Sequence, residues 1–86
     1  MSADLELRVH VLDAWDQVVM RLPAETPISD IKRRALEAAH VSGDPAAFLV
    51  KFRGAEVRDE SRSLQDEQVP GDGALIVMRR RRVPVR

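Results

Sequence analysis

The chain has 86 residues and a formal net charge of zero; 44% of its residues are hydrophobic and 33% are charged, which is typical of one small folded domain. It contains no cysteine, which excludes disulfides, thiol nucleophiles and cysteine-ligated metal sites and suits a reducing compartment. No apolar run reaches the roughly 18 residues of a membrane-spanning helix, and the first residues do not resemble a signal peptide, so we expect a cytoplasmic protein without a membrane span.

Two segments near the start of the chain predict a β-hairpin. Apolar and polar residues alternate over 5–11 and again over 18–22, the pattern of strands with one buried face. The short connection contains Asp13 and Asp16, which favour a turn, so we expect the two strands to pair antiparallel. The predicted buried face carries Leu5, Leu7, Val9 and Val11 from the first strand and Val18, Met20 and Leu22 from the second.

A helix is predicted after Pro23, which ends the second strand. We expect Thr26 to be its N-cap and Pro27 its first residue, with Asp30 in the first turn. Apolar residues then recur at spacings of three and four, which predicts one buried stripe on a helix of about 13 residues. The stripe consists of Ile28, Ile31, Ala35 and Ala39, and turn residues at 42–45 follow it.

The second half of the chain predicts three more strands. Residues 48–52 form a third strand, 56–57 a short one and 74–78 the last, while 58–68 form a surface connection anchored by Leu64. One helix packed on a single face of a four- to five-stranded sheet accounts for both periodicities. We therefore expect an α+β domain over 1–78, followed by a basic tail over 79–86.

The order and spacing of these elements resemble the ubiquitin-like β-grasp family over about residues 4–80. Besides the opening hairpin, the segments that carry the resemblance are 26–32, 50–54 and 64–75. The last of these is similar to the family's pattern of leucine, any residue and aspartate, then an apolar residue, a turn and the final strand. The resemblance implies a mixed sheet with one main helix on one face, in the order ββαββ.

Members of the ubiquitin-like family have two kinds of function. Ubiquitin and the sulfur carriers of thiamin and molybdopterin synthesis end in two glycines, because the terminus must enter a narrow adenylating site. No glycine follows Gly73 here, so the sequence favours the non-conjugating members, which bind other proteins. The chain is similar to the small ubiquitin-like protein of bacterial type VII secretion, and its bias toward arginine suits a bacterium. A covalent modifier or sulfur carrier with an atypical C-terminus is the alternative.

The resemblance also implies a binding patch on the outer sheet face. Ubiquitin's patch positions correspond to Leu12, Lys51, Ile76 and Met78, and strand alternation leaves the last two pointing outward. Trp15 lies in the adjacent turn, and tryptophan is favoured at interfaces. Because Lys51 replaces an apolar residue of ubiquitin, we do not expect ubiquitin's receptors to bind. In the alternative interpretation, Trp15 folds back over the sheet edge and the other apolar residues are scattered.

A cationic run follows the last predicted strand. Residues 1–78 hold nine basic and all 14 acidic residues, a net charge of −5, whereas 79–86 carry +5. The basic residues of the tail are Arg79, Arg80, Arg81, Arg82 and Arg86. They could contact nucleic acid or another anionic surface, dock onto the acidic stretch 56–72 or extend the last strand, or remain solvated.

Catalysis finds little support in the sequence. The only histidines are His10, on the outward face of the first strand, and His40, at the end of the helix. The acidic clusters lack calcium-loop spacing, and no phosphate-binding glycine loop is present. The resemblance implies a structural role for Lys32. We therefore expect no enzymatic activity, cofactor, metal or small-molecule substrate, and a protein as the partner.

Overall fold

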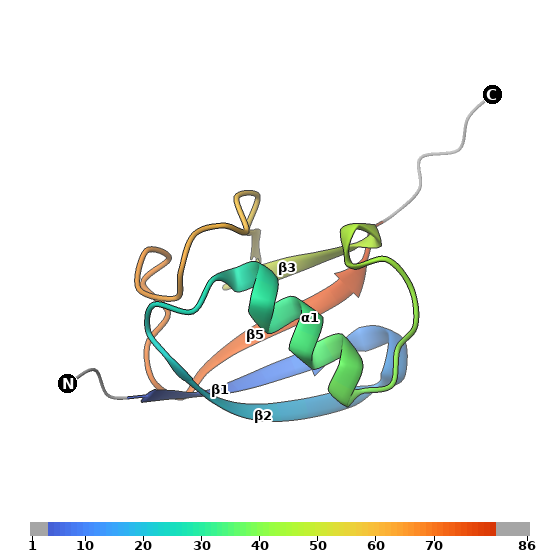
Figure 1. Ribbon diagram of the computed structural model, residues 1–86, viewed down its shortest axis with the longest axis horizontal. Helices are drawn as coiled ribbons and strands as arrows, with labels where there is room; N and C mark the ends of the chain where they lie inside the picture. The colour runs from blue at the N-terminus through green and yellow to red at the C-terminus, as the bar shows by residue number, and fades with distance from the viewer. Residues whose placement is uncertain (1–3, 81–86) are drawn as a thin grey trace.

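The computed structural model describes residues 4–80, which form a five-stranded sheet with one α-helix across one face (Figure 1). The strands are β1 (Asp4–Val11), β2 (Asp16–Pro23), β3 (Phe48–Phe52), β4 (Ala55–Glu56) and β5 (Gly73–Arg79), and the helix is α1 (Ile28–Ala38). Two short 3₁₀ helices, η1 (Leu12–Ala14) and η2 (Pro45–Ala47), complete the fold. The sheet order is β2-β1-β5-β3-β4; β1 and β5 are parallel and the other neighbours antiparallel. This mixed sheet with one main helix confirms the predicted α+β class.

The predicted hairpin forms along its full length. β1 and β2 pair antiparallel from Asp4 opposite Pro23 to Val11 opposite Asp16. The alternating residues of β1 face the helix, and Leu7, Val9 and Val11 are fully buried. Those of β2 are less covered, because β2 lies at the edge of the sheet. Its Val18 and Met20 are half-buried, and only Leu22 is fully in the core.

The helix begins one residue later than predicted. Pro27 is its N-cap and Ile28 its first residue, and the Thr26 hydroxyl donates to the Pro23 carbonyl at 2.7 Å instead of capping the helix. The reason is tertiary. The backbone amides of Ile28 and Ser29 donate to carbonyl groups of the 60–62 segment, each at 2.9 Å, so those helix amides have acceptors without a Thr26 side-chain cap.

The helix ends before the predicted turn at 42–45. His40 adopts a left-handed conformation with φ of 58°, and its amide donates to the Glu37 carbonyl. The amide of Val41 donates to the Leu36 carbonyl at 2.9 Å. These two bonds make a Schellman motif, in which a residue other than glycine occupies the left-handed position.

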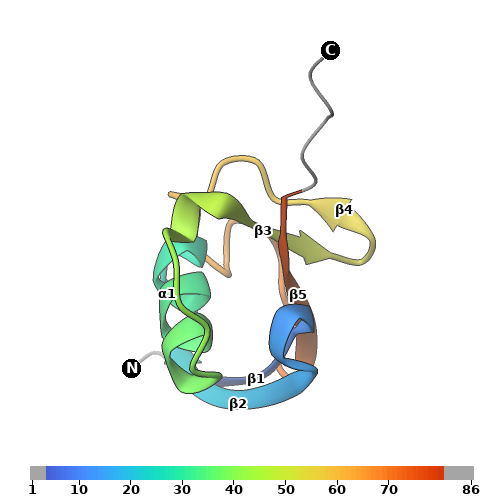
Figure 2. The ribbon, with the colours of Figure 1, turned by 90° about the vertical axis from the view of Figure 1, so that its right-hand side faces the viewer.

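The core lies between α1 and the inner face of the sheet, while no described element covers the opposite face (Figure 2). The predicted anchor Leu64 is fully buried in it, which fixes the long connection between β4 and β5. The largest fully buried side chains are Phe48, Leu7, Ile28, Ile31, Leu64, Leu75, Val9, Val11, Val50 and Val77. Within residues 4–80, no helix is long and apolar enough to cross a membrane.

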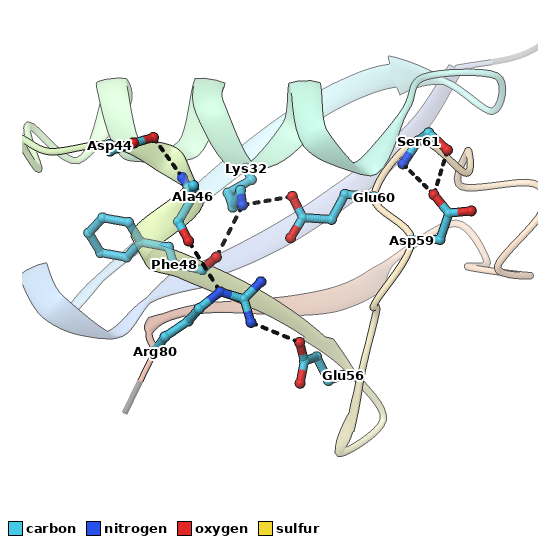
Figure 3. A network of polar contacts seen from close by, with 9 residues as sticks. All are labelled: Lys32, Asp44, Ala46, Phe48, Glu56, Asp59, Glu60, Ser61 and Arg80. Carbon is cyan, nitrogen blue, oxygen red and sulfur yellow. Dashed lines mark hydrogen bonds and ion pairs between the residues drawn. The ribbon is translucent and has the colours of Figure 1, made fainter. Parts of the chain in front are cut away.

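One charged side chain belongs to the core. Lys32 is 4% exposed, and its Nζ lies 2.7 Å from Glu60 Oε1 and 3.1 Å from the Phe48 carbonyl oxygen (Figure 3). The ammonium group therefore joins the helix, β3 and the connection after β4 at one point. A buried charge with a carboxylate and a carbonyl partner is structural, as the resemblance implied.

Candidate protein-binding surface

The strand register brings distant residues together on the uncovered face of the sheet, which we call the outer face. His10 of β1 lies opposite Ile76 of β5, and Ile76 lies opposite Lys51 of β3. In the next row, Leu49 lies opposite Met78. All five side chains are half-buried, whereas the alternate residues of β5 are in the core. The predicted outward orientation of Ile76 and Met78 is therefore confirmed.

A shallow depression of about 410 Å³ opens on this face, where the end of β3 meets the start of β5. Its lining includes His10, Lys51, Phe52, Arg53, Pro70 and Ile76. The turn after β3 shapes one wall, because Arg53 and Gly54 both have positive φ and form a two-residue hairpin loop. The sequence indicated a break at Gly54 but not the depression, which needs residues from three strands.

Trp15 projects from the turn between β1 and β2. Its side chain is 93% exposed, so it does not fold back over the sheet edge. Its backbone is left-handed, with φ of 52°, and its amide donates to the Leu12 carbonyl at 3.1 Å. Leu12 is 41% exposed in the same turn, and Val19 of β2 is the other large apolar residue with this degree of exposure among the described residues.

The five predicted patch residues lie along one side of the molecule but differ in setting. Lys51 and Ile76 are direct cross-strand neighbours, and Met78 follows on the same face of β5. Leu12 comes directly after Val11, which pairs with Val77, so the turn that carries Trp15 lies at the Met78 end of β5. Leu49 and Val19 were missed, although strand alternation alone places both on the outer face.

The first two arginines of the cationic run bind to the domain itself. Arg79 Nε lies 3.0 Å from Asp13 Oδ2, and its guanidinium carbon lies 4.7 Å from the centre of the Phe48 ring. Arg80 contacts Glu56 Oε2 at 3.1 Å and the Ala46 carbonyl oxygen at 3.2 Å (Figure 3). The Arg80–Glu56 pair is with the acidic stretch 56–72 considered from the sequence, whereas Arg79 is the last residue of β5 and extends the predicted strand by one residue. The other arginines of the predicted tail, Arg81, Arg82 and Arg86, lie outside the described residues.

The shifted titratable groups lie away from the outer face, in the connection after β4. The Ser61 hydroxyl and amide donate to the Asp59 carboxylate and lower the pKa of Asp59. The Glu67 carboxylate raises the pKa of Arg62. Both pairs are local contacts of an exposed loop. Across residues 4–80, no three His, Asp or Glu side chains gather in a way that could hold a metal ion.

Comparison with known proteins identifies the fold. No family model matches the chain, and no curated protein matches it in sequence. Solved structures do match. A ubiquitin-like domain from Arabidopsis thaliana superposes with a TM-score of 0.75 and 12% identity, covering 98% of this chain and 85% of that one. The ubiquitin of Caldiarchaeum subterraneum gives 0.76 and 7%, covering 94% and 99%.

A third structure, described as molecular mimicry of SUMO that promotes DNA repair, has a TM-score of 0.77 and 13% identity and covers 90% of this chain and 92% of that one. At such low identity, likeness of structure speaks for the fold and not for a shared activity. The matches nevertheless extend over nearly the whole of each chain. The chain therefore has the ubiquitin-like β-grasp fold that its sequence resemblance implied.

Proposed function

We propose that the chain is a non-catalytic protein-interaction module that binds its partner through the outer face. The contact residues are Leu12, Trp15, Lys51, Ile76 and Met78. The observation that carries the proposal is the setting of Trp15, which is 93% exposed in a left-handed backbone conformation. The ubiquitin-like fold supports a module of this general kind.

Burial among residues 4–80 does not account for a tryptophan at position 15, which is 93% exposed. A left-handed backbone costs roughly 1–2 kcal/mol for a residue with a Cβ, and glycine would avoid that cost. An exposed indole recovers none of it through burial, whereas tryptophan covered by a partner buries about 150–250 Å². Tryptophan is also among the residues that most often dominate binding energy at interfaces. The side chain is therefore suited to a partner rather than to the fold.

The neighbouring surface offers further apolar area. Leu12 and Val19 are both more than one-third exposed, and Ile76 and Met78 present half-buried side chains on the outer face of β5. Exposed apolar area that gathers on one face marks interaction sites more often than scattered single residues do.

We propose that this module works in the cytoplasm of a bacterium as an accessory subunit, without a cofactor.

The test is a pull-down from the source organism with an N-terminally tagged chain, comparing native with denaturing washes by mass spectrometry. The wild type should retain a partner under native washing only, and Trp15→Gly should lose it. His40→Gly is the matched control, because it replaces another exposed left-handed residue on the helix side of the domain. Loss of the partner from both variants, or from neither, would contradict the proposal.

The same experiment separates the alternatives that the sequence left open. Adducts that survive denaturing washes would identify a covalent modifier. Nucleic acid recovered without protein, and lost when 79–86 are removed, would identify a binder that acts through the tail. Either result would replace the proposal.

A further inference from the structure

The cationic side chains of the domain fall into two groups. Among residues 4–80, six of them form ion pairs with carboxylates: Arg21, Lys32, Arg33, Arg62, Arg79 and Arg80. The described cations outside those pairs are Arg8, Arg34, Lys51, Arg53 and Arg58. Of these, Lys51 and Arg53 line the depression, and Arg8 lies on the outer face opposite Ala74, another residue of its lining. Among residues 4–80, three of the five cations outside these ion pairs therefore lie in or beside the depression.

The lining of the depression is cationic and apolar at once. It contains the cations Lys51 and Arg53, the imidazole of His10 and no carboxylate, together with the apolar surfaces of Phe52 and Ile76. The guanidinium carbon of Arg53 lies 5.0 Å from the centre of the Phe52 ring, a cation–π contact that holds it at the rim. The left-handed backbone of Arg53 in the two-residue loop fixes its position further.

Internal contacts occupy Glu56 and Glu6, two of the carboxylates beside this face, whereas Asp72, which precedes the lining residue Gly73, is in none of the ion pairs among residues 4–80. Glu56 of β4 lies opposite Lys51, but its Oε2 is 3.1 Å from Arg80. Glu6 on β1 lies 3.9 Å from Arg21. The Arg80 contact therefore has a consequence beyond its own ion pair, because it leaves the Lys51 ammonium group without an acidic partner.

We propose that the partner presents a segment that carries carboxylates next to an apolar side chain. Its carboxylates pair with Lys51 and Arg53, and its apolar side chain packs against Ile76 and Phe52 in the depression. This inference rests on the proposed function and names the chemistry of the partner. The net charge of −5 over residues 1–78 would instead suggest a cationic partner. The charges close to the depression determine which partner binds there, because screening limits charge interactions to about 10 Å at 0.1 M salt.

The test is selection from a phage-displayed library of random linear peptides against the full chain. We expect peptides enriched in Asp or Glu beside an aliphatic or aromatic residue. Lys51→Gln/Arg53→Gln should weaken their binding at least about fivefold, and higher salt should weaken it as well. Glutamine is neutral and removes the positive charges, whereas glutamate at position 51 would place a second carboxylate opposite Glu56. The matched control is Arg34→Gln/Arg58→Gln, which removes the same charge from two cations outside the depression and should change binding little.

The possible results separate this inference from the proposed function. One result is that the selected peptides show no acidic enrichment, fail to bind Ile76→Thr and Trp15→Gly, and still bind Lys51→Gln/Arg53→Gln. This result would overturn the inference but support the outer face as the binding surface. If no selected peptide depends on outer-face residues for binding, the proposal of a linear acidic segment is overturned. The pull-down tests the outer face as a binding surface independently. A single-stranded oligonucleotide that binds through Lys51 and Arg53 in place of acidic peptides would overturn the inference in favour of a phosphate ligand.

Discussion

Arg79 Nε at the end of the last strand lies 3.0 Å from Asp13 Oδ2 in the turn between the first two strands. The contact joins residues 66 positions apart and holds the turn that carries Trp15 against β5. The first arginine of the cationic run therefore contacts the same turn as the tryptophan that we assign to the interface. Two features that look independent in the sequence form one structural unit.

Loss of this contact should loosen the turn between β1 and β2 but destabilise the fold only slightly. Both side chains are partly exposed, and exposed ion pairs contribute about 0.2–1 kcal/mol to stability. Asp13→Asn should therefore lower the free energy of unfolding by less than about 1 kcal/mol while loosening the turn. Urea denaturation measures the first effect and the fluorescence anisotropy of Trp15, the only tryptophan, the second. An anisotropy unchanged from wild type would show that Arg79 does not position the indole.

Trp15→Gly should stabilise the domain. Glycine removes the cost of the left-handed backbone, and the exposed indole contributes little burial, so we expect a gain of about 1 kcal/mol in the free energy of unfolding. Thermal denaturation should show the midpoint rising by about 4–8 °C for a domain of this size. Trp15→Ala is the control, because alanine keeps the backbone cost and should give no such gain. A marked loss of stability in both variants would mean that the indole packs on the domain.

Removing the buried ammonium group should be costly. Lys32→Met leaves the Glu60 carboxylate, only 15% exposed, without its cation and the Phe48 carbonyl without its donor. Breaking a buried pair on one side costs about 3–5 kcal/mol. The double variant Lys32→Met/Glu60→Gln should recover part of that loss, because the uncompensated charge is gone. Chemical denaturation of the two single variants and the double variant completes the cycle, and strictly additive losses would contradict direct coupling of the pair.

Asp59 should contribute to stability only above acidic pH. The Ser61 donors lower its pKa in the folded state below the ordinary value of 3.8, so the folded protein binds the carboxyl proton less readily than the unfolded chain. The contribution is therefore present above the unfolded pKa and is lost as pH falls through the folded one. NMR titration of the Asp59 carboxyl should show the low pKa in the wild type and a pKa closer to the ordinary value in Ser61→Ala. An identical titration in both proteins would assign the shift to another group.

Local pattern was sufficient to predict most elements of the fold. Alternation predicted the hairpin, a stripe at helical spacing predicted α1, and the lone apolar Leu64 identified the anchor of a polar connection. The errors were at element ends. Thr26 has the chemistry of a cap but does not cap the helix, because carbonyl groups of the 60–62 segment accept from the first helix amides. A tertiary acceptor of this kind leaves no trace near position 26.

The candidate binding surface, like the fold, was predictable from the sequence only in part. The sequence by itself determined which residues point outward from each strand, since alternate side chains must lie on opposite faces, and it identified Trp15 as an unusual turn residue. Only the tertiary structure decided that Lys51 and Ile76 are neighbours and that they share a depression with Arg53. It also decided which cations are free, because Arg80 occupies the carboxylate opposite Lys51. The physical reason is the sheet order, which joins β5 to β1 and β3 across long stretches of chain and sets partners that no local pattern encodes.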